Sequence, residues 1–447
     1  MTPARKVLYL SALSEPTQGA MLHFMNPRLA VTDHVFTVPL DHDEPDAATI
    51  DVFAREVVDP RRVAEPGGLP WLVFLQGGPG GKSPRPGGGY PGWLDRALST
   101  HRLLLLDQRG TGRSTPVTPT VARGFASGED LARYLSLHRA DSIVHDCEYI
   151  RRELCGDQPW ETLGQSYGGF VTLNYLSRYP EGLRACYVTG GIPGLDTTAD
   201  DVYRNTYPRV AAKNAEFYER YPQDRGKVAQ IAEILNTGAV RLPDGYSLTT
   251  DRLRSLGLAF GMGDGYERVH WMLDEAFARP GELSDTFLLN VSGPTGFVDN
   301  PLFTILQEPC FAQGSTPTAW AAQRIMAEHP AFAEDADPLL FTGEMIYPWM
   351  FQDVRALRPF AEAADILAAK DDWPLLYDPK QLAKNEVPLA AAVYHDDMYV
   401  PAEFSLRTLG GLGAARAWVT NEWEHDGGNA SGGSVLARLM DMVAGRV

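Results

Sequence analysis

This sequence has little cysteine, and it lacks long apolar runs and metal-binding motifs. Its four cysteines are Cys147, Cys155, Cys186 and Cys310, and no two of them have C-x-x-C spacing. We therefore expect reduced thiols and no disulfide framework. No stretch approaches the roughly 18 apolar residues that a membrane-spanning helix needs. H-E-x-x-H and comparable ligand clusters are also missing, so we expect no metal and no other cofactor.

Positive charge is scarce as well. The 57 acidic residues outnumber the 40 lysines and arginines, which gives a formal net charge of −17. Nucleic acids and anionic membranes bind basic patches, so we expect neither as a partner. The apolar run Val7–Leu13 follows Arg5 and Lys6 but is short and weak for a signal peptide. These features predict a cytoplasmic protein, and they leave homo-oligomerisation open.

The chain is long enough for one large α/β unit with an insertion or for two domains. Apolar residues alternate in 34–40 and 50–58, which predicts paired strands. Apolar runs that stop at glycines or polar turns predict buried strands in 69–76, 101–106 and 185–189. PWETLGQ (159–165) predicts a further strand that ends at the turn of Ser166. Residues 170–180 have helical spacing and end at a proline. Buried strands that alternate with helices predict an α/β fold with a mostly parallel sheet and helices on both faces.

The pattern changes in the middle of the chain. Helical segments dominate from about 193 to 385, and strand patterns return in 387–397 and 415–428. We therefore predict a core made of residues 27–192 and 386–447, with a large helical cap of residues 193–385 inserted between sheet strands. Residues 1–26 have little pattern and are expected to be an N-terminal extension.

Ser166 lies in the sequence GQSYG, which matches G-x-S-x-G between a predicted strand and a predicted helix. So short a pattern also occurs by chance, and an ordinary hydroxyl in a glycine-rich loop is the alternative. A serine nucleophile needs a base and an orienting carboxylate, which follow in the order Ser, Asp, His in the α/β-hydrolase fold. Asp396 or Asp397 and then His425 follow the last two predicted strands in this order. The sequence therefore predicts an α/β-hydrolase fold with a serine nucleophile.

The loop QGGPGG, residues 76–81, offers a site for the oxyanion. Backbone N–H groups of Gly77 and Gly78, together with that of Tyr167, would stabilise the negative charge of a tetrahedral intermediate. The alternative is a tight turn without a catalytic role. The loop is not a phosphate-binding loop, because Lys82 and Ser83 do not follow the glycines in the required register.

Five segments together resemble the prolyl aminopeptidases, or proline iminopeptidases, which are α/β-hydrolase serine peptidases. They are GGPGG (77–81), DQRGTGRS (107–114), GQSYGG (164–169), DDMYVP (396–401) and EHDGG (424–428). The likeness runs from about residue 27 to the end and corresponds to the longer form with a large cap. One departure is Gln76, where the family commonly has histidine before the glycines.

The resemblance implies Ser166 as the nucleophile, His425 as the base and Asp397 as the acid. Asp397 is preferred to Asp396 because the family has a proline four residues after the acid, and Pro401 takes that place. The implied substrate is a peptide with a free N-terminal proline, and no cofactor is implied. The alternatives are a hydrolase of the same fold that acts on another small amide or ester, and a binding protein without activity.

The resemblance also implies that glutamates in the cap hold the free amine of the substrate. Glu308 in LFTILQEPC and Glu344 in LFTGEMIYPWMF stand in similar places, and both have apolar and aromatic neighbours. Ordinary surface charge is the alternative for each. Aromatic residues that could enclose the proline ring are Phe311, Tyr347, Trp349 and Phe351.

Overall fold

The computed structural model describes residues 21–26, 29–62, 68–86 and 92–447, and its centre is a nine-stranded sheet. The strand order is β1-β2-β3-β5-β4-β6-β7-β10-β11. The strands are β1 (Met21–Asn26), β2 (Leu29–Pro39), β3 (Thr49–Val58), β4 (Trp71–Leu75), β5 (Arg102–Leu106), β6 (Trp160–Gln165), β7 (Leu183–Thr189), β10 (Leu389–Tyr394) and β11 (Ala415–Thr420).

Six neighbouring strands, from β5 to β11 in the sheet order, are parallel, whereas β1, β2 and β3 pair antiparallel at one edge. The segments with alternating pattern thus form the antiparallel part, and the continuous apolar runs form the parallel part. Residues 1–20 of the expected N-terminal extension lie outside the described residues. Met21–Asn26 differs from that expectation, because it forms β1 and pairs with β2.

Both faces of the parallel strands are buried. Leu72 and Phe74 of β4 point into one apolar cluster, and Val73 and Leu75 point into another on the opposite face. Alternation with a period of two residues places successive side chains on opposite faces, so a strand that is apolar at every position must be covered twice.

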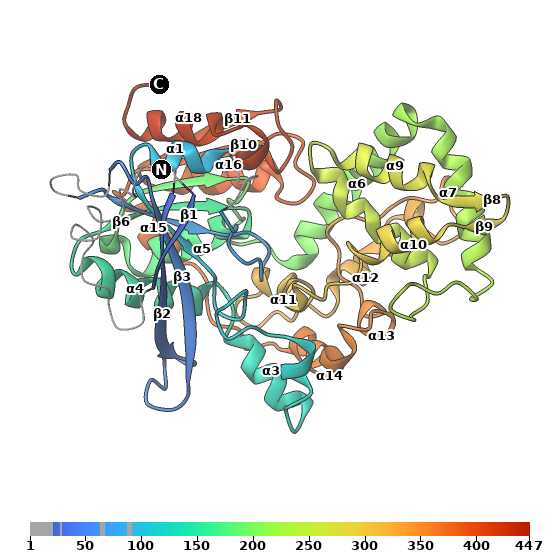
Figure 1. Cartoon of the computed structure of the whole chain (residues 1–447), viewed down its shortest axis with the longest axis horizontal. Coiled ribbons are helices and arrows are strands. Elements are labelled where there is room, and N and C mark those ends of the chain that lie inside the picture. The colour runs from blue at the N-terminus through green and yellow to red at the C-terminus, as the bar shows by residue number, and fades with distance from the viewer. Residues whose placement is uncertain (1–20, 27–28, 63–67, 87–91) are drawn as a thin grey trace, which may run out of the picture.

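Helices cover the two faces of the sheet (Figure 1). One face is covered by α1 (Trp93–Leu98) and α18 (Ser434–Val443). The other face is covered by α4 (Ala140–Cys155), α5 (Tyr167–Arg178) and α16 (Ala402–Gly411). Three further helices outside the insertion are α2 (Pro119–Ala122), α3 (Gly128–Ser136) and α17 (Gly427–Ala430). The predicted mostly parallel sheet with helices on both faces is confirmed.

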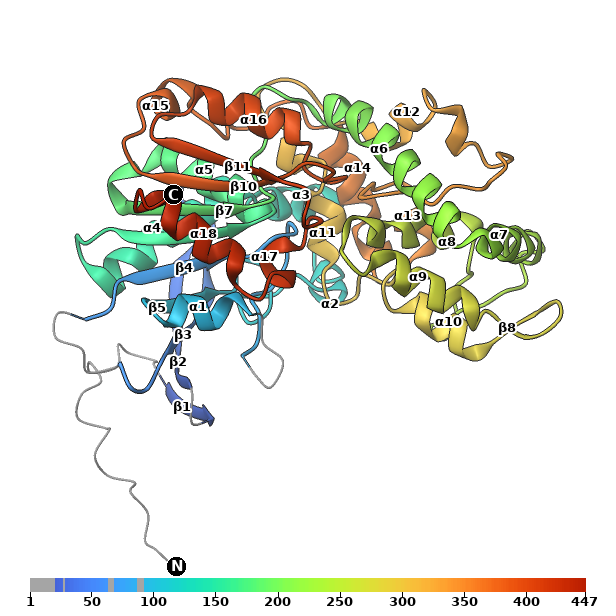
Figure 2. The ribbon, with the colours of Figure 1, turned by 90° about the horizontal axis from the view of Figure 1, so that it is seen from above.

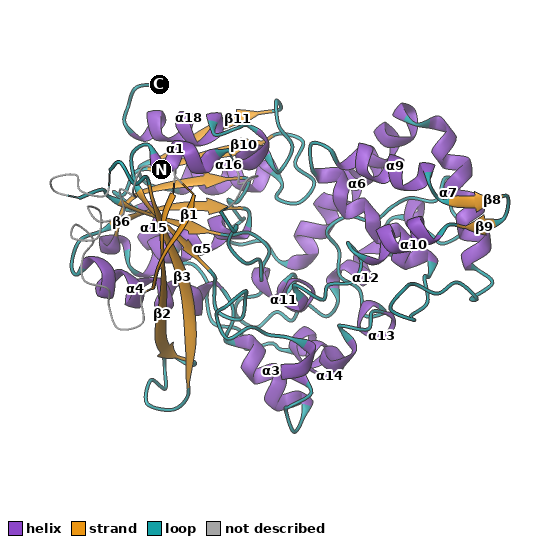
Figure 3. Cartoon of the chain, viewed as in Figure 1, coloured by secondary structure: helices purple, strands orange, loops and turns teal. Residues whose placement is uncertain are grey.

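The chain between β7 and β10 is the helical block, which we define as residues 190–388. Most of it forms a second, mainly helical lobe beside the sheet, whereas its last helix lies against α5 of the core (Figure 3). Its elements are α6 (Ala199–Arg220), α7 (Pro222–Leu235), α8 (Thr250–Arg254), α9 (Gly265–Asp274), α10 (Asp285–Ser292), α11 (Pro301–Leu306), α12 (Ala321–Met326), α13 (Met350–Asp353), α14 (Ala361–Ala369), α15 (Pro379–Ala383) and a hairpin of β8 (Phe277–Arg279) and β9 (Glu282–Leu283). Among the described helices of the whole chain, none is long and apolar enough to cross a membrane.

Candidate active site

The residues singled out in the sequence follow strands whose carboxyl ends share one edge of the sheet. Ser166 directly follows β6, and the glycine loop follows β4. Asp397 comes after β10, and His425 comes after the neighbouring strand β11. Parallel strands bring the loops at their carboxyl ends together, which is where sites form in α/β sheets.

Ser166 sits on a strained turn between β6 and α5, with φ +53° and ψ −123°. A residue with a side chain seldom adopts such a backbone conformation, and it persists only where the surroundings enforce it. A Cβ atom on Gly164 would fall 2.5 Å from the Gly168 carbonyl oxygen, and one on Gly168 would fall 1.9 Å from the Leu75 carbonyl oxygen. The two glycines of G-x-S-x-G are therefore required for the turn to close.

His425 and Asp397 form a buried pair. His425 Nδ1 lies 2.7 Å from Asp397 Oδ2, and the two residues are 3% and 1% exposed. The other carboxylate oxygen, Oδ1, accepts hydrogen bonds from the N–H groups of Tyr399 and Val400 at 2.8 and 3.0 Å. By contrast, the side chain of Asp396 is 55% exposed and contacts its neighbour His395. The geometry brings Asp397, and not Asp396, to the histidine.

Two consecutive glycines after β7 allow Ser166 and His425 to approach the same turn. A Cβ atom on Gly191 would lie 2.1 Å from the Ser166 carbonyl oxygen, and one on Gly190 would lie 3.1 Å from His425 Nδ1. The Ser166 N–H also donates to the Thr189 carbonyl at 3.0 Å. The turn after β7 thus contacts both the serine and the histidine, an arrangement that the sequence analysis did not anticipate.

The pKa of His425 is raised above its ordinary value of 6.5. Burial alone would lower this pKa, because it disfavours the charged imidazolium. Burial is the largest single effect, but the charge and hydrogen bond of Asp397, together with the charges of Glu344 and Asp426, outweigh it. The surroundings of the His425 ring therefore stabilise its protonated form.

The glycine loop lies against the serine turn. A Cβ atom on Gly77 would fall 2.9 Å from Ser166 Cβ, and Gly78 has φ +133°, which favours glycine. Among the described residues, no group accepts a hydrogen bond from the N–H of Gly78 or of Tyr167. These two N–H groups are therefore available to donate hydrogen bonds to an oxyanion.

Asp107 of the DQRGTGRS segment binds the chain that directly follows the glycine loop. Its buried carboxylate accepts hydrogen bonds from the Ser83 N–H at 3.1 Å, from Arg85 at 2.7 and 2.6 Å, and from the Arg113 N–H at 2.9 Å. The bidentate contact with Arg85 is the strongest form of this interaction. The segment that most resembles the family thus supports the loop that would bind the oxyanion.

Glu308 and Glu344 face a common set of neighbours in the helical block. Both carboxylates raise the pKa values of the Tyr203 hydroxyl and the Cys310 thiol, whose burial is the main cause of those shifts. Tyr203 is 1% exposed, and its hydroxyl has no hydrogen-bond partner among the described residues. Sequence reasoning missed Tyr203, because nothing in its local sequence distinguishes it from other helical tyrosines.

The two glutamates differ in their hydrogen bonds. Glu308 accepts from the N–H groups of Ala321 and Ala322 at 3.1 and 2.9 Å, at the start of α12. Burial raises its pKa to about 7 against the effect of these bonds. Burial also raises the pKa of Glu344 to about 7, although the residue as a whole is only partly buried. The charge of His425 opposes this rise, and that of Asp397 adds to it. Glu344 is thus the glutamate that interacts with the catalytic candidates.

The aromatic residues named as possible walls of a proline pocket have different surroundings. Phe311 packs edge-on against Phe170 of α5, with ring centroids 5.6 Å apart. Tyr347 is buried, and its hydroxyl lies 2.9 Å from that of Tyr207 inside the helical block. Phe311 is therefore the candidate that contacts the helix of the serine turn.

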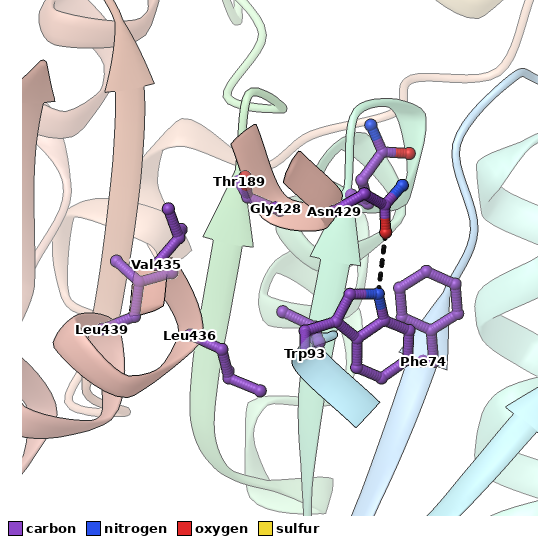
Figure 4. Close-up of a pocket in the computed structure, with 10 residues that line it drawn as sticks. Phe74, Trp93, Thr189, Gly428, Asn429, Val435, Leu436 and Leu439 are labelled. Atoms are coloured by element: carbon purple, nitrogen blue, oxygen red, sulfur yellow. Dashed lines mark hydrogen bonds between the residues drawn. The ribbon is translucent and has the colours of Figure 1, made fainter. Parts of the chain in front are cut away.

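A small apolar cavity is lined by residues of β4, α1, α17 and α18, among them Gly428 and Asn429 (Figure 4). Trp93 Nε1 donates to Asn429 Oδ1 at 2.9 Å and ties α1 to α17, just after the histidine. The cavity leaves about 10 Å³, which is no more than one water molecule needs. It belongs to the packing beneath the site and has no room for a substrate.

Comparison with known proteins agrees with the fold. The family model described as alpha/beta hydrolase fold matches residues 70–232, and the chain is an α/β hydrolase. The proline iminopeptidase of Aeromonas sobria is 46% identical over 94% of this chain and 98% of that protein. Proline iminopeptidase aneH of Aspergillus aculeatus is 32% identical over 92% of this chain and 93% of that protein. The chain therefore belongs to the proline iminopeptidase family, and the resemblance seen in the sequence is confirmed.

One solved structure has lower sequence identity. The crystal structure of VinJ shares 15% sequence identity and has a TM-score of 0.42, over 93% of this chain and 99% of that chain.

Proposed function

We propose that the protein is a serine aminopeptidase that releases N-terminal proline from peptides. Ser166 is the nucleophile, His425 the base and Asp397 the orienting acid; the N–H groups of Gly78 and Tyr167, with Gly77 beside them, bind the oxyanion. Membership of the proline iminopeptidase family supports this function. The observation that carries the proposed mechanism is the buried His425–Asp397 pair at 2.7 Å, where His425 approaches the same Gly190–Gly191 turn as the strained Ser166.

The reaction proceeds in two halves. Ser166 Oγ attacks the carbonyl carbon of the N-terminal proline while His425 Nε2 takes up the hydroxyl proton. The resulting oxyanion is held by the backbone N–H groups. His425 then gives the proton to the departing nitrogen, the C–N bond breaks, and a prolyl ester on Ser166 remains. A water molecule, deprotonated by the same histidine, hydrolyses the ester and releases proline.

Recognition of the free amine is assigned to Glu344 and Glu308, within a cap made of residues 193–385. A protonated N-terminal proline presents two N–H donors on a compact ring, which carboxylates in apolar surroundings can match. An internal peptide bond offers no positive charge to these carboxylates, so their charges would stay uncompensated in apolar surroundings, which is costly. Selectivity for the N-terminus thus arises because internal peptide bonds are disfavoured, as well as because the protonated N-terminal proline is bound.

A cytoplasmic site of action completes the proposal. All four cysteines are free in the structure, and three of them are buried. Unpaired thiols are typical of reducing compartments. Neither a nucleic acid nor an anionic membrane is expected as a partner, because the chain has a formal net charge of −17.

Replacement of Glu344 by glutamine should lower kcat/KM on L-proline 4-nitroanilide by roughly 10- to 200-fold, because a hydrogen bond to a charged group contributes about 1.5–3 kcal/mol. The N-acetylated substrate should be cleaved poorly by the wild-type protein, and Glu344→Gln should barely change that rate. Glu334→Gln, an exposed glutamate of the same block, is the matched control and should behave as wild type.

Equal cleavage of the free and acetylated prolyl substrates by the wild type would contradict recognition of the amine. The protein would then be a hydrolase of the same fold that acts on other small amides or esters. Glu308→Gln is a less direct test, because it also removes an acceptor from the start of α12.

Inactivation of the protein by a fluorophosphonate should slow as the pH falls, with a midpoint above the ordinary histidine value of about 6.5. The reagent needs the serine and a neutral His425 but carries no amine, so its rate isolates the base. Because the charge of Glu344 helps to raise the histidine pKa, Glu344→Gln should move the midpoint to lower pH. A midpoint below 6.5 in the wild type, or an upward shift in the variant, would contradict this electrostatic account.

A further inference from the structure

One face of α6 makes hydrogen bonds and an ion pair with the segments that follow β10 and β11. Three polar residues stand four positions apart on this helix, so they share one face. Figure 2 shows α6 starting beside α16 and running along the helical block. The contacts are Asn205 with Glu403, Arg209 with the His395 carbonyl at 3.2 Å, and Lys213 Nζ with Glu424 Oε1 at 2.6 Å.

Two of these contacts fall next to the candidate catalytic residues. Glu424 directly precedes His425, and His395 stands two residues before Asp397. The helical block also contacts the histidine loop through its backbone. The His425 N–H donates to the Gly261 carbonyl at 3.0 Å, and the Gly263 N–H donates to Asp426 Oδ1 at 3.1 Å. The block therefore holds the histidine loop from several sides.

Lys213 is the most buried member of the α6 face, with 5% exposure. Burial raises the pKa of Glu424, and Lys213 opposes that shift by hydrogen bond and charge. Buried ion pairs often add little net stability, because both charges must be removed from water. Such a pair can nevertheless fix the relative position of the two segments that carry it.

We propose that Lys213 and Arg209 are positioning residues, through which α6 sets the loops of His425 and Asp397 for the reaction. This inference rests on the proposed function. His425 must lie within hydrogen-bond reach of Ser166 Oγ, whereas the amine of the substrate is held elsewhere in the helical block. Loosening the α6 contact should thus slow the chemical step without weakening substrate binding to the same extent.

The test measures kcat and KM on L-proline 4-nitroanilide for Lys213→Met. We expect kcat to fall by about 10- to 100-fold, the size of effect that a displacement of about 1 Å has on a reacting group, with KM changed by less than about threefold. The rate of fluorophosphonate inactivation should fall in parallel. Arg204→Met is the matched control, because Arg204 is on the same helix but pairs with Glu328 inside the helical block, and it should keep wild-type kcat.

A second variant separates positioning from stability. Lys213→Met leaves Glu424 without its partner and should lower Tm, whereas Lys213→Met/Glu424→Gln removes the unpaired charge and should recover most of that loss. The double variant should still have low kcat, and it serves as the test if the single variant does not fold. Wild-type kcat in the double variant would overturn the inference while leaving the proposed function intact. A wild-type protein that does not cleave prolyl substrates would overturn both.

Discussion

Ser166→Ala should abolish cleavage of prolyl substrates, with a loss of roughly 10⁴- to 10⁶-fold in kcat, while the protein stays folded. The substitution removes only the hydroxyl oxygen, which makes no hydrogen bond with a described residue, and alanine keeps the Cβ that the strained turn already holds. The measurement is turnover of L-proline 4-nitroanilide together with Tm and circular dichroism. Ser136→Ala, at the end of α3, is the matched control and should keep full activity.

Labelling gives the same prediction a second readout. A fluorophosphonate should modify the wild-type protein once per chain at Ser166, and it should not modify Ser166→Ala. Activity above a trace in that variant, or labelling of a different serine, would show that another group carries the reaction.

Much of this fold can be predicted from the sequence, because its strands carry strong local signals. Residues 71–75 and 103–106 are apolar at every position, and they form strands covered on both faces. Ser166 is also locally encoded, since the glycines at 164 and 168 are needed where Cβ atoms would collide. Residues whose structure depends on neighbours in sequence are the ones that a pattern predicts well.

Contacts between distant segments were not predictable in the same way. Glu308 binds the start of α12, thirteen and fourteen residues further along, so its carboxylate is partly engaged in holding that helix. The hydrogen bonds of α6 with the loops after β10 and β11 join residues about 190 to 210 positions apart. Helical spacing identifies the face that carries these residues, but only the packing of the helical block shows what that face contacts.

The DQRGTGRS segment lies between these two cases. Its likeness to a family was visible, yet its physical role was not. Asp107 ties the segment to Ser83 and Arg85 beyond the glycine loop, and this contact spans more than twenty residues. The segment is therefore informative because it supports the loop beside the serine, even though it supplies no catalytic group.

Asp397→Asn should lower kcat by roughly 10⁴-fold, although asparagine has nearly the same shape. In the native protein, Oδ1 accepts two backbone hydrogen bonds and Oδ2 accepts from His425 Nδ1. The two backbone N–H groups should hold the amide oxygen of asparagine at the Oδ1 position, so its NH₂ group would point at His425 Nδ1. The ring would then have to accept at Nδ1 and carry its proton on Nε2, which could no longer receive the proton of Ser166.

Asp396→Asn is the matched control for this substitution, because it changes the adjacent aspartate in the same way. The Asp396 side chain is 55% exposed and pairs with an exposed histidine, an interaction that contributes little. We expect its kcat to stay within about twofold of wild type, since exposed ion pairs seldom affect distant chemistry. Comparable losses in both variants would point to general damage to the loop after β10. Loss in Asp396→Asn alone would make Asp396 the orienting acid. Loss in Asp397→Asn alone, with Tm unchanged, is the result expected if the buried carboxylate controls the tautomer of His425.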